Sequence, residues 1–517
     1  MRRLYSIAGA AAVLVAGACN DLEITNPNNP DVARALASPD DVRNISISTV
    51  NSWYLAATHY EPFTALCVTA DACTANFGNF GMRFNNLEPR IPYENNSAGG
   101  DRFVSSRPWD SYYGTLGAAN DALRAYGAGV DLATPAETAK FKALAQFTQA
   151  ASLMNLGLLF DRAFVVDEAF DPTGPKPELV PYKDVSAAAV TKWEALIAAT
   201  AGKAESYDPT VIPLSIGPLT SVRLNRVANT LAALTLAYTP RNAAEAAAVD
   251  WTKVAAFADK GIGSGSAGAP FDFTVIGDNN NWYSYLVFYG DAHSWIRTDQ
   301  RLINRMDPSI PVKFNGTIVP RGTSPDARYL ADFSFRTPVI GDPGRGIYMQ
   351  SPWYHSRYEA HALTQAATSA RTPVPYLLAA ENDLVRAEAL IRKTGPDLAT
   401  AATLINNSRV TRGGLPAAMA ANGAATLLSY IEYEREIELH NTSGFTHFQR
   451  RHVDGLQAGT WRHLPIPAKE LETLVLPIYT FGGVGKPDMN LMLPTGELTM
   501  LRSVPKHEPP KRVSPIF

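Results

Sequence analysis

Apolar residues recur at spacings of three and four along much of the chain, which is the period of an amphipathic helix. The clearest stripes run over 112–126, 144–158, 224–238 and 377–391. Further helices are predicted at about 32–57, 184–200, 251–262, 398–411 and 425–440. Small residues, often alanine, recur on the stripes and allow helices to pack closely, as in stacked helical hairpins. The pattern therefore predicts an all-α, mostly helical fold.

One helical hairpin can be recognised from the residues that end its first helix and begin its second. The stripe that ends near Lys393 is followed by Gly395, Pro396 and Asp397, and a new stripe begins at Leu398. Glycine ends a helix, proline blocks its continuation and aspartate can cap the next helix. The segment predicts a helix–turn–helix unit of tetratricopeptide type.

Two stretches interrupt the helical pattern, at about 64–108 and 264–375. They are rich in Gly, Pro, Asn, Asp and aromatic residues. Within the second, 312–319 predicts a small β-hairpin with Asn315-Gly316 at its turn, and Arg345–Met349 predicts a short strand. Long irregular loop insertions in a helical body, with a few short strands, are more often functional than accidental.

The first residues have the character of an export signal. Arg2 and Arg3 precede a short apolar run, and small residues lead directly to Cys19. The apolar run is shorter than the roughly 20 residues that span a bilayer. Residues 1–18 are predicted to be a lipoprotein signal peptide, because Val15–Cys19 resembles a bacterial lipobox. Residues 19–31 would then be a lipidated cysteine and an extended Asn/Pro tether. An ordinary signal peptide with an incidental cysteine is the alternative.

Composition, net charge and the cysteine count narrow the class of protein and the kinds of site to expect. The chain has 517 residues, 46% hydrophobic and 18% charged, as in a globular protein, and its formal charge of −3 gives no sign of nucleic-acid binding. Besides Cys19, the cysteines are Cys67 and Cys73. In an exported protein they can close a small disulfide loop, whereas a metal site would need further ligands nearby. We predict the disulfide and no metal site.

Several segments, in order along the chain, resemble the SusD/RagB-type outer-membrane lipoproteins. The start "CNDLEITNPNNP" is similar to the family's lipidated cysteine and tether, and "WDSYYGTLGAANDALRAY" to its Trp-x-x-x-Tyr…Ala-Asn helix. The stretches 376–416 and 431–451 are similar to its C-terminal hairpin and to its Glu-Arg-x-x-Glu-Leu helix with the following turn. The turn departs from the family pattern at 441–449, which suggests a divergent branch.

The resemblance implies a fold and a function. It implies tetratricopeptide-like helical hairpins, with an N-terminal part over 32–262 and a C-terminal part over 263–517 in one compact unit. It also implies an outer-membrane lipoprotein that faces the cell exterior and caps a SusC-like TonB-dependent transporter. Such proteins capture nutrients, most often oligosaccharides, for import, and no catalysis or cofactor is implied.

Carbohydrate binding needs flat aromatic side chains for the apolar faces of sugar rings and polar groups for the hydroxyls. The irregular stretches supply both, and we take as candidate ligand-binding residues Trp282, Tyr283, Tyr285, Tyr289, Trp295, Asn280, Asn281, Asp291, Arg297, Phe77, Phe80 and Arg83. For any one aromatic residue, a place in the core is the competing interpretation.

Three other functions remain open at this point. The ligand could be a peptide, as in the RagB branch, or the protein could be a structural lid for the transporter without strong binding of its own. An extracellular glycoside hydrolase is the third, but it needs two carboxylates flanking a cleft, and no such pair is evident. Four histidines between 440 and 463 match no zinc motif.

Overall fold

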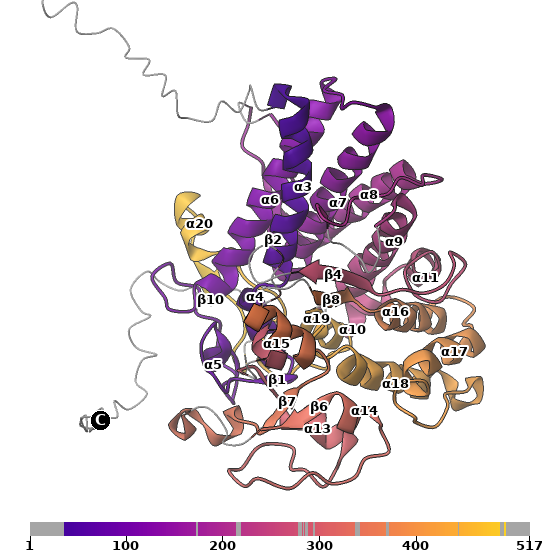
Figure 1. Ribbon diagram of the computed structural model, residues 1–517. Coiled ribbons are helices and arrows are strands. Elements are labelled where there is room, and N and C mark those ends of the chain that lie inside the picture. The colour runs from indigo at the N-terminus through magenta and orange to yellow at the C-terminus, as the bar shows by residue number, and fades with distance from the viewer. Residues whose placement is uncertain are drawn as a thin grey trace, which may run out of the picture.

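The computed structural model describes residues 36–171, 174–212, 219–277, 282, 284, 288–292, 295–336, 342–368, 372–442, 444–485 and 491–492. Most of this chain is helical, which confirms the predicted fold class (Figure 1). The predicted signal peptide (1–18) and tether (19–31) lie outside the described residues. None of the helices described is long and apolar enough to cross a membrane.

Most of the longer helices lie close to their predicted positions. The longer helices are α3 (Pro39–Ala57), α4 (Tyr60–Thr69), α6 (Phe103–Gly127), α7 (Pro135–Leu159), α8 (Tyr182–Thr200), α9 (Ser221–Tyr238), α11 (Trp251–Asp259), α15 (Glu359–Thr368), α16 (Ala379–Arg392), α17 (Leu398–Arg409) and α18 (Gly423–Glu438). The exceptions are α4 and α15, which are not predicted from the sequence and which lie mostly or wholly within the stretches expected to be irregular. Short helical segments are α5 (Met82–Asn85), α10 (Ala243–Ala247), η1 (Phe288–Ala292), α13 (Gln300–Met306), α14 (Arg328–Ala331), η2 (Pro343–Arg345), η3 (Ile347–Met349), η4 (Ala420–Asn422), α19 (Thr446–Arg451) and α20 (Ala468–Thr473).

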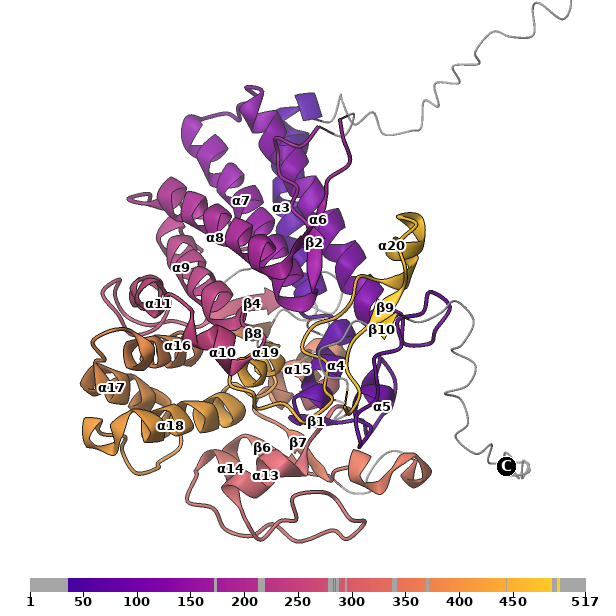
Figure 2. The same ribbon diagram turned by 180° about the vertical axis from the view of Figure 1, so that it is seen from behind.

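The helices form a continuous series in which each packs on the next. The order of contact is α6, α7, α8, α9, α11, α16, α17 and α18, and α3 packs against both α6 and α7. Figures 1 and 2 show this series curving from the top of the molecule down one side, as the predicted stack of helical hairpins requires. The largest apolar core contains residues from both halves of the chain, such as Leu144 and Leu464.

The α16–α17 turn is formed as its sequence predicts. Gly395 has a φ of 69°, a left-handed conformation that glycine adopts without steric cost. Asp397 caps α17, because its side chain accepts a hydrogen bond from the backbone N–H of Thr400 at 3.0 Å. The predicted hairpin of tetratricopeptide type is therefore confirmed.

The strands are short and form five antiparallel pairs in the part of the chain described. They are β1 (Cys73–Thr74) with β5 (Arg297–Thr298), β2 (Arg162–Phe164) with β3 (Leu179–Pro181), β4 (Phe273–Gly277) with β8 (Thr372–Leu377), β6 (Phe333–Phe335) with β7 (Trp353–His355), and β9 (Tyr479–Thr480) with β10 (Leu491–Met492).

Two strand predictions are wrong. Residues 312–319 form a loop instead of a hairpin, and Arg345 and Met349 belong to the 3-10 turns η2 and η3. Val312 and Ile318 are 53% and 40% exposed, so a hairpin here would bury little apolar surface. An isolated two-stranded hairpin is marginal in water without such burial.

Three of the four histidines between 440 and 463 are buried in the protein interior: His440, His447 and His452. His447 on α19 is fully buried, its Nδ1 lies 2.9 Å from the Thr69 hydroxyl, and its ring packs 4.8 Å from that of Trp461. Burial, and then the positive charges of Arg451 and Arg241, hold the pKa of His447 well below its ordinary value. The folded protein therefore keeps this histidine neutral.

The burial of His447 is expected to make the folded protein less stable at acid pH. The pKa of His447 is lower in the folded protein than in the unfolded chain, where it is about 6.5. As the pH falls below about 6.5, this histidine binds a proton in the unfolded chain but not in the folded protein, so the folded protein loses stability. Between pH 7 and pH 5.5, the free energy of unfolding of the parent should fall by about 1 kcal/mol relative to that of a His447→Gln variant. Denaturant unfolding of both proteins at the two pH values measures this difference. His361→Gln, at an exposed position on α15, is the control and should behave as the parent.

Candidate ligand-binding site

The pairing of β1 with β5 brings the two irregular stretches of the chain together. Cys73 lies opposite Thr298 and Thr74 opposite Arg297. The strands are antiparallel, so residues that follow Thr74 run beside residues that precede Arg297. This register places Phe77 next to Trp295, although 218 positions separate them in the sequence (295 − 77).

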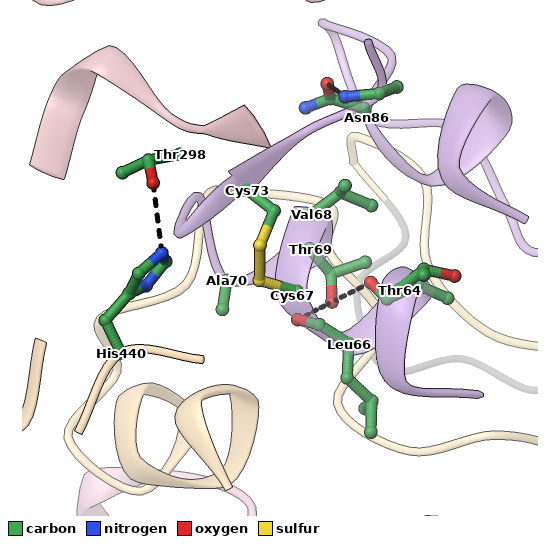
Figure 3. Close-up of a disulfide and its surroundings, with 12 residues drawn as sticks. Thr64, Leu66, Cys67, Val68, Thr69, Ala70, Cys73, Asn86, Thr298 and His440 are labelled. Carbon is green, nitrogen blue, oxygen red and sulfur yellow. Dashed lines mark hydrogen bonds between the residues drawn. A yellow bond between two sulfur atoms is a disulfide. The ribbon is translucent and has the colours of Figure 1, made fainter. Parts of the chain in front are cut away.

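A disulfide joins β1 to the end of α4. Cys67 and Cys73 are bonded, with their Cα atoms 5.2 Å apart, and Figure 3 shows the bridge between the helix and the strand. Thr298, on the partner strand, has its hydroxyl 3.2 Å from His440 Nε2. Both cysteines are buried. The bridge therefore fixes the position at which the two stretches meet.

Five half-buried rings gather beside this junction, and we call them the aromatic cluster: Tyr60, Phe77, Phe80, Tyr289 and Trp295. Trp295 stacks on Phe77, with ring centroids 4.7 Å apart and planes at 7°, and on Tyr289 at 4.9 Å and 27°. Tyr60 lies 4.0 Å from Phe80, and Phe80 lies 5.9 Å from Tyr289. The rings come from α4, the loop after β1, η1 and the segment between η1 and β5.

The partial exposure of Trp295 sets it apart from the other tryptophans. All eight tryptophans of the chain are described, and the remaining seven are buried. A tryptophan left partly in water inside a stack of aromatic rings is a common anchor in ligand and protein interfaces. Trp295 is therefore the tryptophan that a bound molecule can reach.

Polar groups adjoin the cluster on the side of Tyr60. The His59 ring lies 4.0 Å from that of Tyr60, and the Arg107 guanidinium lies 6.0 Å from the Tyr60 ring. Arg107 also donates to Glu61 Oε2 at 2.8 Å. Burial, and then the charge of Arg107, lower the pKa of His59 to about 4, so its imidazole is neutral at pH 7. Nδ1 of His59 accepts from the Glu61 backbone N–H at 3.2 Å, which leaves the proton on Nε2.

Other polar side chains flank Phe77 and Phe80. Asn79 and Arg83 are exposed, and Arg345 Nη1 donates to the Phe77 carbonyl at 3.3 Å. Arg83 lies with its guanidinium 5.7 Å from the ring of its neighbour Phe84. Aromatic faces with amide and guanidinium groups at their edge have the chemistry that sugar rings and their hydroxyls require.

Two candidate residues lie in the interior instead of at this surface. Trp282 is 6% exposed and packs in the main core, with its ring 5.7 Å from that of Tyr54. Arg297 is fully buried and donates from Nη1 to the carbonyls of Arg336 and Pro352, each at 3.1 Å. The prediction that they line the ligand site is corrected: Trp282 fills the core, and Arg297 binds backbone carbonyls.

The other candidates divide into two groups. Phe77, Phe80, Tyr289 and Trp295 come together in the aromatic cluster, with Arg83 nearby. Tyr283, Tyr285, Asn280 and Asn281 lie outside the described residues, and so does the side chain of Asp291, whose backbone belongs to η1.

Sequence reasoning missed Tyr60 and His59. They lie at the junction of α3 and α4, between the predicted end of a helix at about 57 and the predicted start of an irregular stretch at about 64. An adjacent His-Tyr pair at a helix boundary was the available signal, but nothing in the spacing connects it to Phe80, which follows 20 positions later (80 − 60). Among the residues described, no group of three or more His, Cys, Asp or Glu side chains is arranged to hold a metal ion.

The chain has the fold of SusD-like proteins. A SusD superfamily protein from Parabacteroides distasonis aligns over 83% of this chain and 96% of its own, with a TM-score of 0.59 and 12% identity. Surface glycan-binding protein A from Bacteroides uniformis aligns over 84% and 98%, with a TM-score of 0.56 and 14% identity. A laminarin-binding SusD-like protein aligns over 83% and 97%, with a TM-score of 0.55 and 15% identity. No family model and no curated protein matches the sequence.

Proposed function

We propose that this protein is a SusD-like lipoprotein that captures a glycan at the cell surface and delivers it to a SusC-like TonB-dependent transporter. The aromatic cluster is the binding site in this proposal, and the protein acts by binding, without catalysis. Cys19 is the lipid anchor to the outer membrane, and the segment 19–31 is the tether that holds the folded part outside.

The aromatic cluster is the observation that supports a glycan as the ligand. Its rings are half-buried, so they are held in place by packing and still offer surface to a ligand. The apolar face of a sugar ring packs on such surfaces, while hydroxyl groups find Arg345, Asn79 and the His59–Arg107 pair at the edge. The SusD-like fold adds support, because proteins with this fold include a surface glycan-binding protein and a laminarin-binding protein.

The test is a titration of the purified full-length protein. Laminarin, amylose, xyloglucan and a mixture of peptides are added separately while tryptophan fluorescence and heat are recorded. A saturable signal with one glycan class, and none with the peptides, is the expected result. Binding of the peptides alone would show that the cluster serves a different ligand. The absence of any binding, together with co-purification of a transporter barrel, would favour a lid without binding of its own.

A further inference from the structure

A groove runs along the surface between α3 and α6. It encloses a volume of 340 Å³, within the range of about 300–1,000 Å³ that is typical of ligand clefts. Its walls carry hydroxyl groups from both helices, among them Ser48, Ser52, Ser111 and Thr115. On α6 the lining positions 107, 111, 114 and 118 recur at helical spacing, so a single face of that helix borders the groove.

The groove begins at the aromatic cluster. His59 and Arg107 line one end of it, and both contact Tyr60, a member of the cluster. From Arg107 to Ala118 the groove follows 11 residues of α6 (118 − 107), or about 16 Å at 1.5 Å per residue. Figure 1 shows α4, which carries Tyr60, directly below the lower ends of α3 and α6. The cluster and the groove therefore meet at Tyr60, beside His59 and Arg107.

The chemistry of the groove is polar and nearly neutral. Its charged side chains are those of Arg107 and Asp110, of opposite sign, and Arg107 is already paired with Glu61. The imidazole of His59 is neutral at pH 7 because burial and the charge of Arg107 lower its pKa to about 4. The hydroxyls of Ser48 and Thr115 already donate to the carbonyls of Ile45 and Ser111, at 2.9 and 2.7 Å, and their oxygens can still accept hydrogen bonds. Such uncharged polar groups match the hydroxyls of an uncharged sugar chain.

We infer that the α3–α6 groove binds the continuation of the same glycan chain that the aromatic cluster holds, so that the protein recognises an extended, uncharged polysaccharide and not a chain end alone. This inference rests on the proposed function. It assigns the sugar units beyond the aromatic cluster to the hydroxyl-lined faces of the two helices.

Two glycines on α6 provide a matched pair of variants. Gly114 lines the groove, whereas Gly117 does not, and both are exposed. A Cβ added at either position meets no atom within 4 Å, so each site accepts a side chain without a clash. Gly114→Gln therefore fills the groove, and Gly117→Gln makes the same chemical change on the same helix outside it.

The measurement compares short and long ligands of one linkage. Laminaribiose and laminariheptaose, maltose and maltoheptaose, and cellobiose and celloheptaose are titrated calorimetrically into the full-length parent and both variants. In the series that binds, the heptasaccharide should bind the parent about tenfold more tightly than the disaccharide, the worth of one or two net hydrogen bonds. Gly114→Gln should abolish most of this advantage and leave disaccharide binding unchanged, whereas Gly117→Gln should match the parent.

The possible outcomes separate this inference from the proposed function. If glycan binds and Gly114→Gln keeps the full advantage of the longer chain, the groove inference is wrong while the proposed function stands. If Gly114→Gln binds glycan as the parent does but co-purifies with less transporter, the groove contacts a protein, and the inference is again wrong. If no series binds the parent, both are overturned.

Discussion

Replacing Trp295 with alanine is expected to weaken glycan binding by about thirtyfold, which corresponds to a loss of about 2 kcal/mol at a central aromatic anchor. Trp295 is the ring on which both Phe77 and Tyr289 stack, at 4.7 and 4.9 Å. Its removal takes away apolar contact area and also the support of the two neighbouring rings. Calorimetric titration with the glycan that binds the parent measures the change.

Two further variants test whether the loss of affinity is due to the aromatic ring of Trp295. Trp295→Phe keeps a flat ring and should recover much of the affinity. Phe84→Ala removes an aromatic side chain that is 44% exposed and lies outside the cluster, so it should bind as the parent does. Equal losses in Trp295→Ala and Phe84→Ala would mean that the cluster has no special part in binding.

The second large effect concerns stability, at Arg328 on α14. This arginine is fully buried and is surrounded by carboxylates. It donates to Asp326 Oδ2 at 2.8 Å, to Glu434 Oε2 at 2.7 Å and to Glu438 Oε2 at 3.2 Å. Arg328→Ala removes the closest arginine from the buried carboxylates of Asp326 and Glu434, while Glu438 keeps its pairs with Arg357 and Arg412. A cost of about 3–5 kcal/mol is expected when one partner of a buried ion pair is removed.

Scanning calorimetry tests this expectation. If the folded part of the chain unfolds in a single transition, the Tm should fall by roughly 4 °C. The shift is small because the unfolding entropy, by which the change in free energy is divided, grows with chain length. Arg124→Ala is the matched control, because Arg124 pairs with Asp121 on the surface, where both side chains are about 40% exposed. Such a pair contributes only about 0–1 kcal/mol. Arg328→Met should be as harmful as Arg328→Ala, because it restores volume and not charge. A stable Arg328→Met protein would contradict this account.

The helices were predictable because their signal is local. The apolar stripe over 144–158 specifies a buried face at helical spacing, and α7 forms over Pro135–Leu159 around it. The caps are equally local, as Asp397 shows at the start of α17. The predicted hairpin over 312–319 failed for the opposite reason. Its turn signal is local, but a strand pair needs a partner surface to cover it, and no short-range pattern reports on that surface.

The site was only partly predictable because it depends on contacts between distant segments. Aromatic composition drew attention to the stretches that contain Phe77 and Trp295, two rings that the fold brings together. It could not separate Trp295 from Trp282, since both lie in the same aromatic run and only the packing decides which one is buried. Nor could it include Tyr60, which reaches the cluster through the path of α4.

The disulfide between Cys67 and Cys73 has a consequence for when the site is completed. Such bonds persist in oxidising compartments and are rare where cellular reductants keep thiols reduced. The bridge ties α4, which carries Tyr60, to β1, which leads to Phe77 and Phe80. While the chain is still in a reducing environment, these two supports of the aromatic rings are joined only by ordinary packing. If the protein is exported as proposed, oxidation is a final assembly step of the aromatic cluster, and it takes place after the chain has left the cytoplasm and before the protein meets its ligand.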